Sequence, residues 1–116
     1  MADCKTSVSG KEVETYFHDC MPLFIALGDE MRLNIIEVLS HAVQSGNRDG
    51  LNVNEITRQL GLSRPAISHH LKILKNSGLV KVRESGTSNF YQLTLRECTQ
   101  RLMTLGFMVE QVLSPE

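Results

Sequence analysis

The sequence predicts a mainly α-helical domain that carries a small β-hairpin, which places it in the α+β class. A helix-forming segment at 53–60 is followed by Gly61 and by a second such segment at 64–76. Two short β-forming runs around a polar turn come next, within 80–93. Two helices joined by a tight turn and followed by a hairpin make up a winged helix-turn-helix.

Length and composition limit the classes of protein that the chain can belong to. Its 116 residues, 41% of them hydrophobic, suit one domain with a small core. Apolar runs are too short for a membrane span and no signal-peptide pattern opens the chain, so we expect a cytoplasmic protein. The sequence has no phosphate-binding glycine loop, metal-hydrolase motif or nucleophile motif, and we therefore do not expect an enzyme.

Charge is distributed unevenly along a chain whose net charge is −1. Residues 54–101 contain eight Lys or Arg and three Asp or Glu, whereas the rest of the chain contains four and ten. A basic centre between acidic ends favours a nucleic-acid footprint on the central residues. The alternative is that this excess is ordinary surface charge.

The N-terminal residues are predicted to form a mobile tail and an amphipathic helix. The tail covers the polar residues 1–10, and the folded domain covers 11–113, beginning with a helix over 11–27. Pro22 should kink that helix or split it in two, and Gly28 should end it. Its apolar residues repeat at heptad spacing and form a narrow seam: Val13, Phe17, Cys20, Phe24 and Leu27.

The next helix is expected over 30–42, because Asp29 is a suitable N-cap. For Arg32 we expect a structural ion pair with a nearby carboxylate rather than a DNA contact. A loop should follow at 43–52, and residues 51–53 could add a short strand to the hairpin. The inward-facing residues of the helix are expected to be Leu33, Ile36 and either Leu39 or Val38.

The helix over 64–76 is the centre of the predicted fold. Ser63 can cap it through its hydroxyl, and Pro65 lies in the first turn, where the missing N–H does no harm. Gly78 follows its last turn, as is typical of helix ends. One side of the helix is an apolar stripe that we expect to be buried: Ile67, Leu71 and Leu74.

The other side of this helix carries donors and cations that suit phosphates and base edges: Ser63, Arg64, Ser68, His69, Lys72 and Lys75. Ser68 and His69 are expected to reach base edges, with Arg64 at a guanine or a phosphate. The two lysines are expected at phosphates, and Ser63 could combine capping with a phosphate contact. His70 lies nearer the buried side, and we interpret it as structural.

The hairpin is predicted from alternating apolar and charged residues at 80–83, a polar turn at 85–89 and the run 90–93. Lys81 lies in the first strand. Three residues of the hairpin could reach phosphates or the adjacent minor groove: Arg83, Thr87 and Ser88.

A last helix is expected after Thr94, which forms a capping-box pattern with Glu97, and it should end at Pro115. Its apolar seam could pair with that of 11–27 across a two-fold axis in a dimer. The two copies of the helix over 64–76 would then lie about 34 Å apart, which is one turn of DNA. The alternative is that both seams pack within one chain. The seam of the last helix consists of Leu95, Cys98, Leu102, Leu105, Val109 and Val112.

The order and spacing of these motifs resemble those of ArsR/SmtB-type bacterial repressors. Residues 27–36 resemble the opening of that family, 62–72 its recognition helix, and 77–80 with 90–93 its wing. The resemblance covers roughly 23–113. It implies a winged-helix repressor that binds double-stranded DNA as a homodimer built from its first and last helices.

Members of that family usually release DNA on a chemical signal, most often metal, arsenic or thiol oxidation. Metal-sensing members carry a Cys-x-Cys pair where this chain has LNVNE at 51–55, so we expect no metal cofactor of that type. Cys20 and Cys98 lie on the two seams and could form a disulfide or polysulfide, or bind arsenite or a soft metal. Cys4 could supply a third thiolate. The alternative is that these cysteines are only small buried hydrophobes.

The sequence therefore predicts a transcriptional regulator that binds a specific DNA sequence, a homodimeric repressor of the ArsR type on a palindromic operator. We expect it in the bacterial cytoplasm, associated with the nucleoid. A winged helix that serves protein–protein contact is the alternative, and the basic face of 64–76 argues against it.

Overall fold

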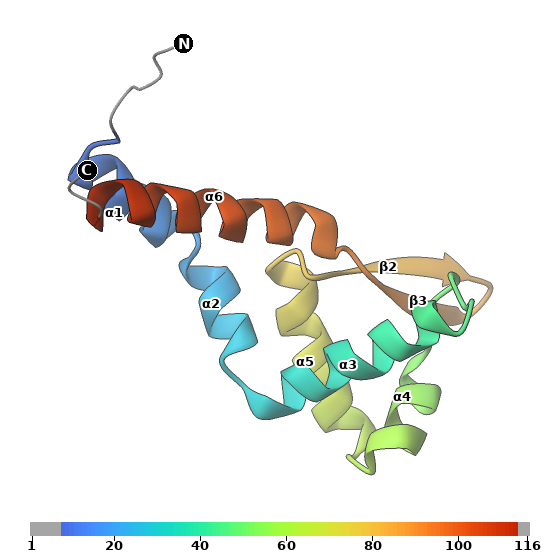
Figure 1. The fold of residues 1–116 in the computed structure, drawn as a ribbon. Helices are drawn as coiled ribbons and strands as arrows, with labels where there is room; N and C mark the ends of the chain where they lie inside the picture. Colours follow the sequence, from blue (N-terminus) through green and yellow to red (C-terminus); the bar gives the residue numbers. More distant parts are fainter. Residues whose placement is uncertain (1–7, 114–116) are drawn as a thin grey trace.

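The computed structural model of the protein describes residues 8–113, within which the chain forms six helices and one two-stranded sheet (Figure 1). None of the described helices is long and apolar enough to cross a membrane. The elements are α1 (Gly10–Asp19), α2 (Met21–Leu27), α3 (Glu30–Gln44), α4 (Val53–Leu60), α5 (Arg64–Asn76), β2 (Val80–Ser85), β3 (Ser88–Leu93) and α6 (Leu95–Leu113).

The predicted N-terminal helix is divided in two, as one reading of Pro22 required. Cys20 separates α1 from α2, and Pro22 lies in the first turn of α2. The predicted tail over 1–10 is wrong at its end, because Ser9 already caps α1. The Glu12 N–H donates to the Ser9 hydroxyl at 3.1 Å, and the Ser9 N–H donates to the Glu12 carboxylate at 2.9 Å. Residues 1–7 lie outside the described part of the chain.

The core forms where α2, α3, α4, α5 and the hairpin meet. The apolar stripe predicted for α5 is confirmed, since all three of its residues are fully buried. The expectation for Leu33 is wrong, because this side chain is 47% exposed. The expectation for Leu39 is confirmed, and Ile35, four residues before it, is the other buried position of α3. The core includes Leu23, Ala26, Ile35, Leu39, Leu51, Ile56, Ile67, Leu71, Leu74 and Leu79.

The hairpin is antiparallel, with Val80 opposite Leu93 at its base. Its turn is tighter than predicted, because the strands continue to Ser85 and Ser88 and leave only two residues between them. The extra strand expected at 51–53 is a single bridge between Leu51 and Tyr91. It goes no further because α4 begins at Val53.

The long helix α6 begins directly after Thr94, as predicted, and packs against α1 (Figure 1). The Thr94 hydroxyl donates to the Gly78 carbonyl at 2.7 Å, which ties the start of α6 to the end of α5. The predicted seams need a correction: Cys20, Cys98 and Leu105 are buried within the single chain. The intramolecular packing of the terminal helices accounts for this, whereas Phe17 and Val112 of the predicted seams remain exposed.

Candidate nucleic-acid interface

The recognition helix α5 is fixed at its start by local hydrogen bonds. The Ser63 hydroxyl accepts a hydrogen bond from the Ala66 N–H at 3.3 Å, which confirms the predicted cap. Gly61 ends α4 in the left-handed conformation, with φ at 73°, where glycine has no steric penalty. The buried side chains of Ile56 on α4 and Ile67 on α5 belong to the same core. The polar side of α5 is therefore held facing outward.

A groove of about 270 Å³, here called the tip groove, lies between α4, α5 and the turn of the hairpin. It brings together four residues that the sequence placed at DNA, although they come from two segments of the chain: Arg64, Ser68, Thr87 and Ser88. Three asparagines that the sequence reasoning missed also line it: Asn52, Asn54 and Asn89. Their amides can donate and accept, as base-edge contacts require.

A second groove of about 860 Å³, here called the side groove, runs between α5 and the two strands. Its lining contains three cations and one carboxylate: Lys72, Lys75, Lys81 and Glu84. Ser68, Asn89 and Tyr91 line both grooves, so the two form one continuous surface. This surface combines Arg64 and neutral donors near the hairpin turn with lysines further along α5 and on β2.

Three predicted residues lie outside the linings of these grooves. Ser63 and His69 are exposed on α5, and the His69 ring lies 5.6 Å from the ring of His70. Arg83 turns toward the loop before α4 instead. Its guanidinium lies 5.1 Å from the centroid of Phe90, and its Nη2 donates to the Asp49 carbonyl at 3.5 Å. Of the three hairpin residues predicted to contact DNA, Thr87 and Ser88 therefore lie in the tip groove, and Arg83 lies outside both grooves.

Arg64 is oriented by a neighbour that the sequence reasoning did not single out. Its Nη1 donates to the Asn54 side-chain oxygen, across the turn between α4 and α5. Asn54 stands at the second position of α4, where a short polar side chain is exposed. The signal that could have found it is the pair Asn52 and Asn54 at the start of the first helix of the motif. The contact presents a planar donor group at the tip groove.

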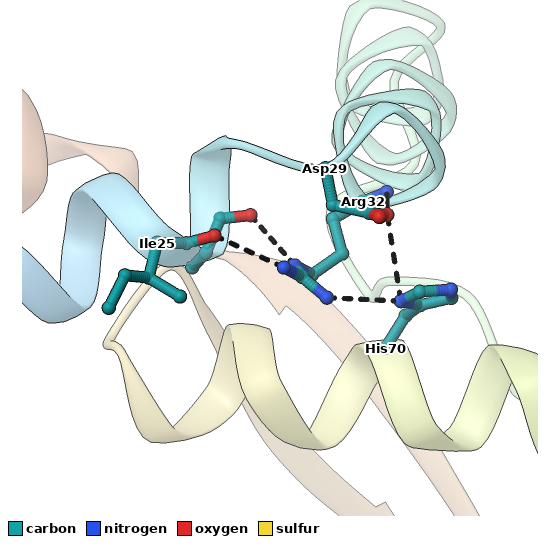
Figure 2. Close-up of polar contacts among 5 residues, drawn as sticks. Ile25, Asp29, Arg32 and His70 are labelled. Carbon is teal, nitrogen blue, oxygen red and sulfur yellow. Dashed lines mark hydrogen bonds and ion pairs between the residues drawn. The ribbon is translucent and has the colours of Figure 1, made fainter.

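Arg32 joins α2, α3 and α5 through its whole guanidinium (Figure 2). Its Nε donates to the Ala26 carbonyl at 2.8 Å and its Nη2 to the Ile25 carbonyl at 3.1 Å. Its Nη1 lies 3.3 Å from Nδ1 of His70, and that nitrogen lies 3.8 Å from the Asp29 carboxylate. The structural role predicted for Arg32 and His70 is thus confirmed.

The expected carboxylate partner of Arg32 is corrected, because the guanidinium bonds to carbonyls and an imidazole. Asp29 instead accepts the backbone N–H of Arg32 at 3.1 Å, as the N-cap of α3. That hydrogen bond lowers the pKa of the Asp29 carboxyl below its ordinary value, partial burial opposes the shift, and the nearby charge of Arg32 adds to it.

The two described cysteines are buried and free. The Cys98 thiol donates to the Gly78 carbonyl at 3.4 Å, and burial raises its pKa. A protonated, buried thiol is a weak nucleophile and a weak metal ligand. Cys4, the third predicted sensor residue, lies outside the described residues. Within residues 8–113, no three His, Cys, Asp or Glu side chains are grouped as a metal site would need.

Comparison with known sequences gives consistent matches. Residues 29–82 match the family model described as bacterial regulatory protein, arsR family. An HTH-type transcriptional regulator of Methanocaldococcus jannaschii is 42% identical over 71 residues, which are 61% of this chain and 73% of that protein. One from Mycobacterium tuberculosis is 46% identical over 59% of this chain and 57% of its own length. The transcriptional activator HlyU of Vibrio cholerae is 32% identical over 75% of this chain and 74% of its own.

Solved structures agree on the fold. Reduced HlyU from Vibrio cholerae superposes with a TM-score of 0.62 at 28% identity, over 90% of this chain and 98% of that one. The repressor BigR from Xylella fastidiosa gives a TM-score of 0.60 at 20% identity, over 93% and 99%. A homodimeric winged helix-turn-helix domain from Mycobacterium bovis gives 0.62 at 24% identity, over 97% and 94%. The last two likenesses establish the architecture alone.

Proposed function

This chain belongs to the ArsR family of transcriptional regulators, and from that premise we propose that it binds a palindromic operator as a homodimer and represses transcription. Members of the family are DNA-binding regulators and not enzymes. The observation that carries the proposal is the continuous surface of the tip and side grooves, which joins the recognition helix to the hairpin. Its residues supply both neutral donors and cations, and DNA needs both.

In this proposal α5 lies in the major groove and the hairpin follows the phosphate backbone beside it. Ser68 and His69 reach base edges, and Arg64, oriented by Asn54, binds a guanine or a phosphate. Lys72 and Lys75 neutralise phosphates from the side groove. The remaining contacts are made by neutral or small side chains at the start of α5 and at the hairpin turn: Ser63, Thr87 and Ser88.

Exposed apolar side chains support a homodimer. Phe17, Met21 and Ile25 recur at four-residue intervals along α1 and α2 and are 46%, 37% and 62% exposed. Met103 and Phe107 repeat this spacing on α6, at 68% and 59%. Large apolar side chains gathered on terminal helices are typical of a protein interface. A second copy using the same face would relate two recognition helices by a two-fold axis, which matches a palindromic site.

Repression is proposed as the direction of regulation. Relatives with related sequences are named as repressors, among them the arsenical resistance operon repressor of Escherichia coli, 38% identical over 62% of this chain and 56% of its own length. HlyU, by contrast, is named an activator. A transcription assay on the selected operator distinguishes these outcomes. We place the protein in the bacterial cytoplasm, on the nucleoid.

A chemical signal that releases DNA would have to reach cysteines that are buried in this structure. Cys20 and Cys98 are buried, and burial raises the pKa of the Cys98 thiol. Oxidation, or binding of arsenite or a soft metal, therefore requires α1, α2 or α6 to open first. Because α1 and α6 also carry the proposed dimer face, such opening would disturb the spacing of the recognition helices.

The competing function is a winged helix that binds another protein. A protein-binding face is usually depleted in lysine at its centre. The side groove instead contains Lys72, Lys75 and Lys81. This composition favours a polyanionic partner.

The test is to select bound duplexes from a random DNA library and then to measure variant affinities on the recovered sequence. Arg64→Ala and His69→Ala should each weaken operator binding by about 1–3 kcal/mol without unfolding the protein. Lys11→Ala, on α1, is the matched control and should bind like the parent chain. Recovery of no common sequence, or unchanged affinity in both variants, would contradict the proposed reading face.

A further inference from the structure

A cavity of about 250 Å³ lies on the other side of the hairpin, between the last turns of α3, the loop 45–50 and the two strands. Apart from Lys81 and Tyr91, its lining residues lie outside the proposed DNA surface. Its aliphatic lining residues are Leu39, Val43 and Leu93. The segment that closes it belongs to the loop predicted at 43–52.

The loop is held against the hairpin by specific contacts. The Gln92 side-chain amide donates to the Arg48 carbonyl at 2.8 Å, and the backbone of Leu51 pairs with that of Tyr91. Gly50 has φ at 95°, and a Cβ there would overlap the Tyr91 carbonyl oxygen. At the other end, the Asn47 N–H donates to the Ala42 carbonyl at 2.8 Å. The cavity is therefore bounded by fixed walls.

The polar part of the lining is cationic. Arg48 and Lys81 contribute two positive charges, and none of the described residues that line the cavity is acidic. Two amides, Asn47 and Gln92, add hydrogen-bonding groups. The lining therefore joins an apolar part to convergent polar groups, and small-molecule sites combine these two features. These charges favour an anion, and a volume of about 250 Å³ suits a ligand smaller than those that occupy the usual sites of roughly 300–1,000 Å³.

The cavity also shares residues with the DNA surface. Lys81 and Tyr91 line both the cavity and the side groove, from the two strands that separate them. A carboxylate bound in the cavity would attract the Lys81 ammonium away from a DNA phosphate. A ligand in the cavity would then weaken DNA binding, because it would engage Lys81 and the hairpin that carries it.

We propose that this cavity binds a small carboxylate with a compact apolar body, and that the bound carboxylate lowers affinity for the operator. The first half concerns the free protein alone. The second half rests on the proposed function. The apolar body lies against Leu39, Val43 and Leu93, and the carboxylate pairs with Arg48 and Lys81.

The test uses benzoate as the probe and the DNA-free protein, followed by amide NMR. Saturable shifts should appear in the loop 45–50, in both strands and at the end of α3, and benzyl alcohol should produce much weaker ones. Lys81→Met and Arg48→Met should each reduce benzoate affinity by roughly tenfold. Arg58→Met, an exposed substitution on α4, is the matched control and should leave it unchanged. Val43→Phe retains both cations but fills the chamber, and it should abolish binding.

Two outcomes overturn the proposal: shifts that are absent or scattered over the whole protein, or equal binding by the parent chain and both cation variants. Operator affinity with and without benzoate is then measured by anisotropy. Localised binding with unchanged operator affinity would refute the link to DNA. Failure to find any operator would refute the proposed function, and the NMR result on free protein would still decide whether the cavity binds carboxylates.

Discussion

Replacing Arg32 with alanine should destabilise the protein more than any exposed arginine can. The guanidinium makes two hydrogen bonds to the carbonyls of Ile25 and Ala26 and a third contact to His70. The two carbonyls belong to the end of α2, where the helix dipole favours a cation. Removing the side chain takes this donor from the part-buried Ala26 carbonyl, whereas the exposed Ile25 carbonyl keeps the Gly28 N–H at 3.2 Å.

The expected loss follows from the number and kind of these bonds. A hydrogen bond to a charged group contributes about 1.5–3 kcal/mol, and two bonds of which one is exposed place the total near 3 kcal/mol. Arg32→Lys keeps the charge but not the planar fork, so it should recover less than half of the loss. Urea unfolding followed by circular dichroism measures both values, because the denaturation midpoint falls when the slope is unchanged.

Arg58→Ala provides the control, since this arginine is exposed on α4 and should change stability by less than about 0.5 kcal/mol. An Arg32→Ala loss that equals the control value would refute the assignment of Arg32 as the link between α2, α3 and α5. A large loss that Arg32→Lys fully recovers would show that charge alone, without the forked geometry, accounts for the effect.

Three further predictions concern single sites. Gly50→Ala should destabilise by about 1–3 kcal/mol in thermal unfolding, because its positive φ and the nearby Tyr91 carbonyl exclude a Cβ; an unchanged melting temperature would contradict this. Asp29 has a lowered pKa when folded, so its contribution is present above the ordinary value of 3.8 and lost as pH falls through the folded pKa. Asp29→Asn should therefore flatten the acid limb of the stability curve, and an unaltered limb would exclude the cap as its cause. Cys98 should react with iodoacetamide far more slowly in the native protein than in urea, as mass spectrometry can measure; equal rates would disprove its burial.

Local signals predicted most of the helix-turn-helix correctly. Ser63, Pro65 and the apolar stripe of α5 define one helix through caps and periodicity, and these depend only on near neighbours in the chain. Gly61 ends α4 for the same reason. Pro22 predicted a division of the first helix without deciding between a kink and a break, because that choice depends on how α2 packs.

Errors arose where contacts between distant segments decide the outcome. Heptad spacing predicts the same apolar seam on α6 whether the helix packs on α1 of its own chain or on a second copy. Because Cys98 is buried in the single chain, part of this seam packs within the chain. Leu33 and Ile35 both fit an amphipathic helix, and only the position of α3 on the core separates them. The partners of Arg32 are backbone carbonyls, which side-chain types do not reveal.

The DNA surface was partly predictable for a similar reason. Residues of α5 share one face through helix geometry, so Arg64, Ser68 and the lysines could be grouped from spacing. The direction of Arg83 depends on Phe90 and on the loop before α4, and the sequence did not give that contact. Asn54 and Asn89 join the surface only through the fold.

The central claim is that the two grooves bind a specific DNA sequence through phosphate-anchored contacts. Fluorescence anisotropy of the selected operator, measured in a salt series with reduced protein, tests it most directly. The account predicts nanomolar affinity for the operator, far tighter than for random DNA, and a steep negative slope of log K against log salt. Lys72→Gln should reduce that slope by roughly one for each protomer bound. Weak binding that is equal on all DNA and insensitive to salt would contradict the account.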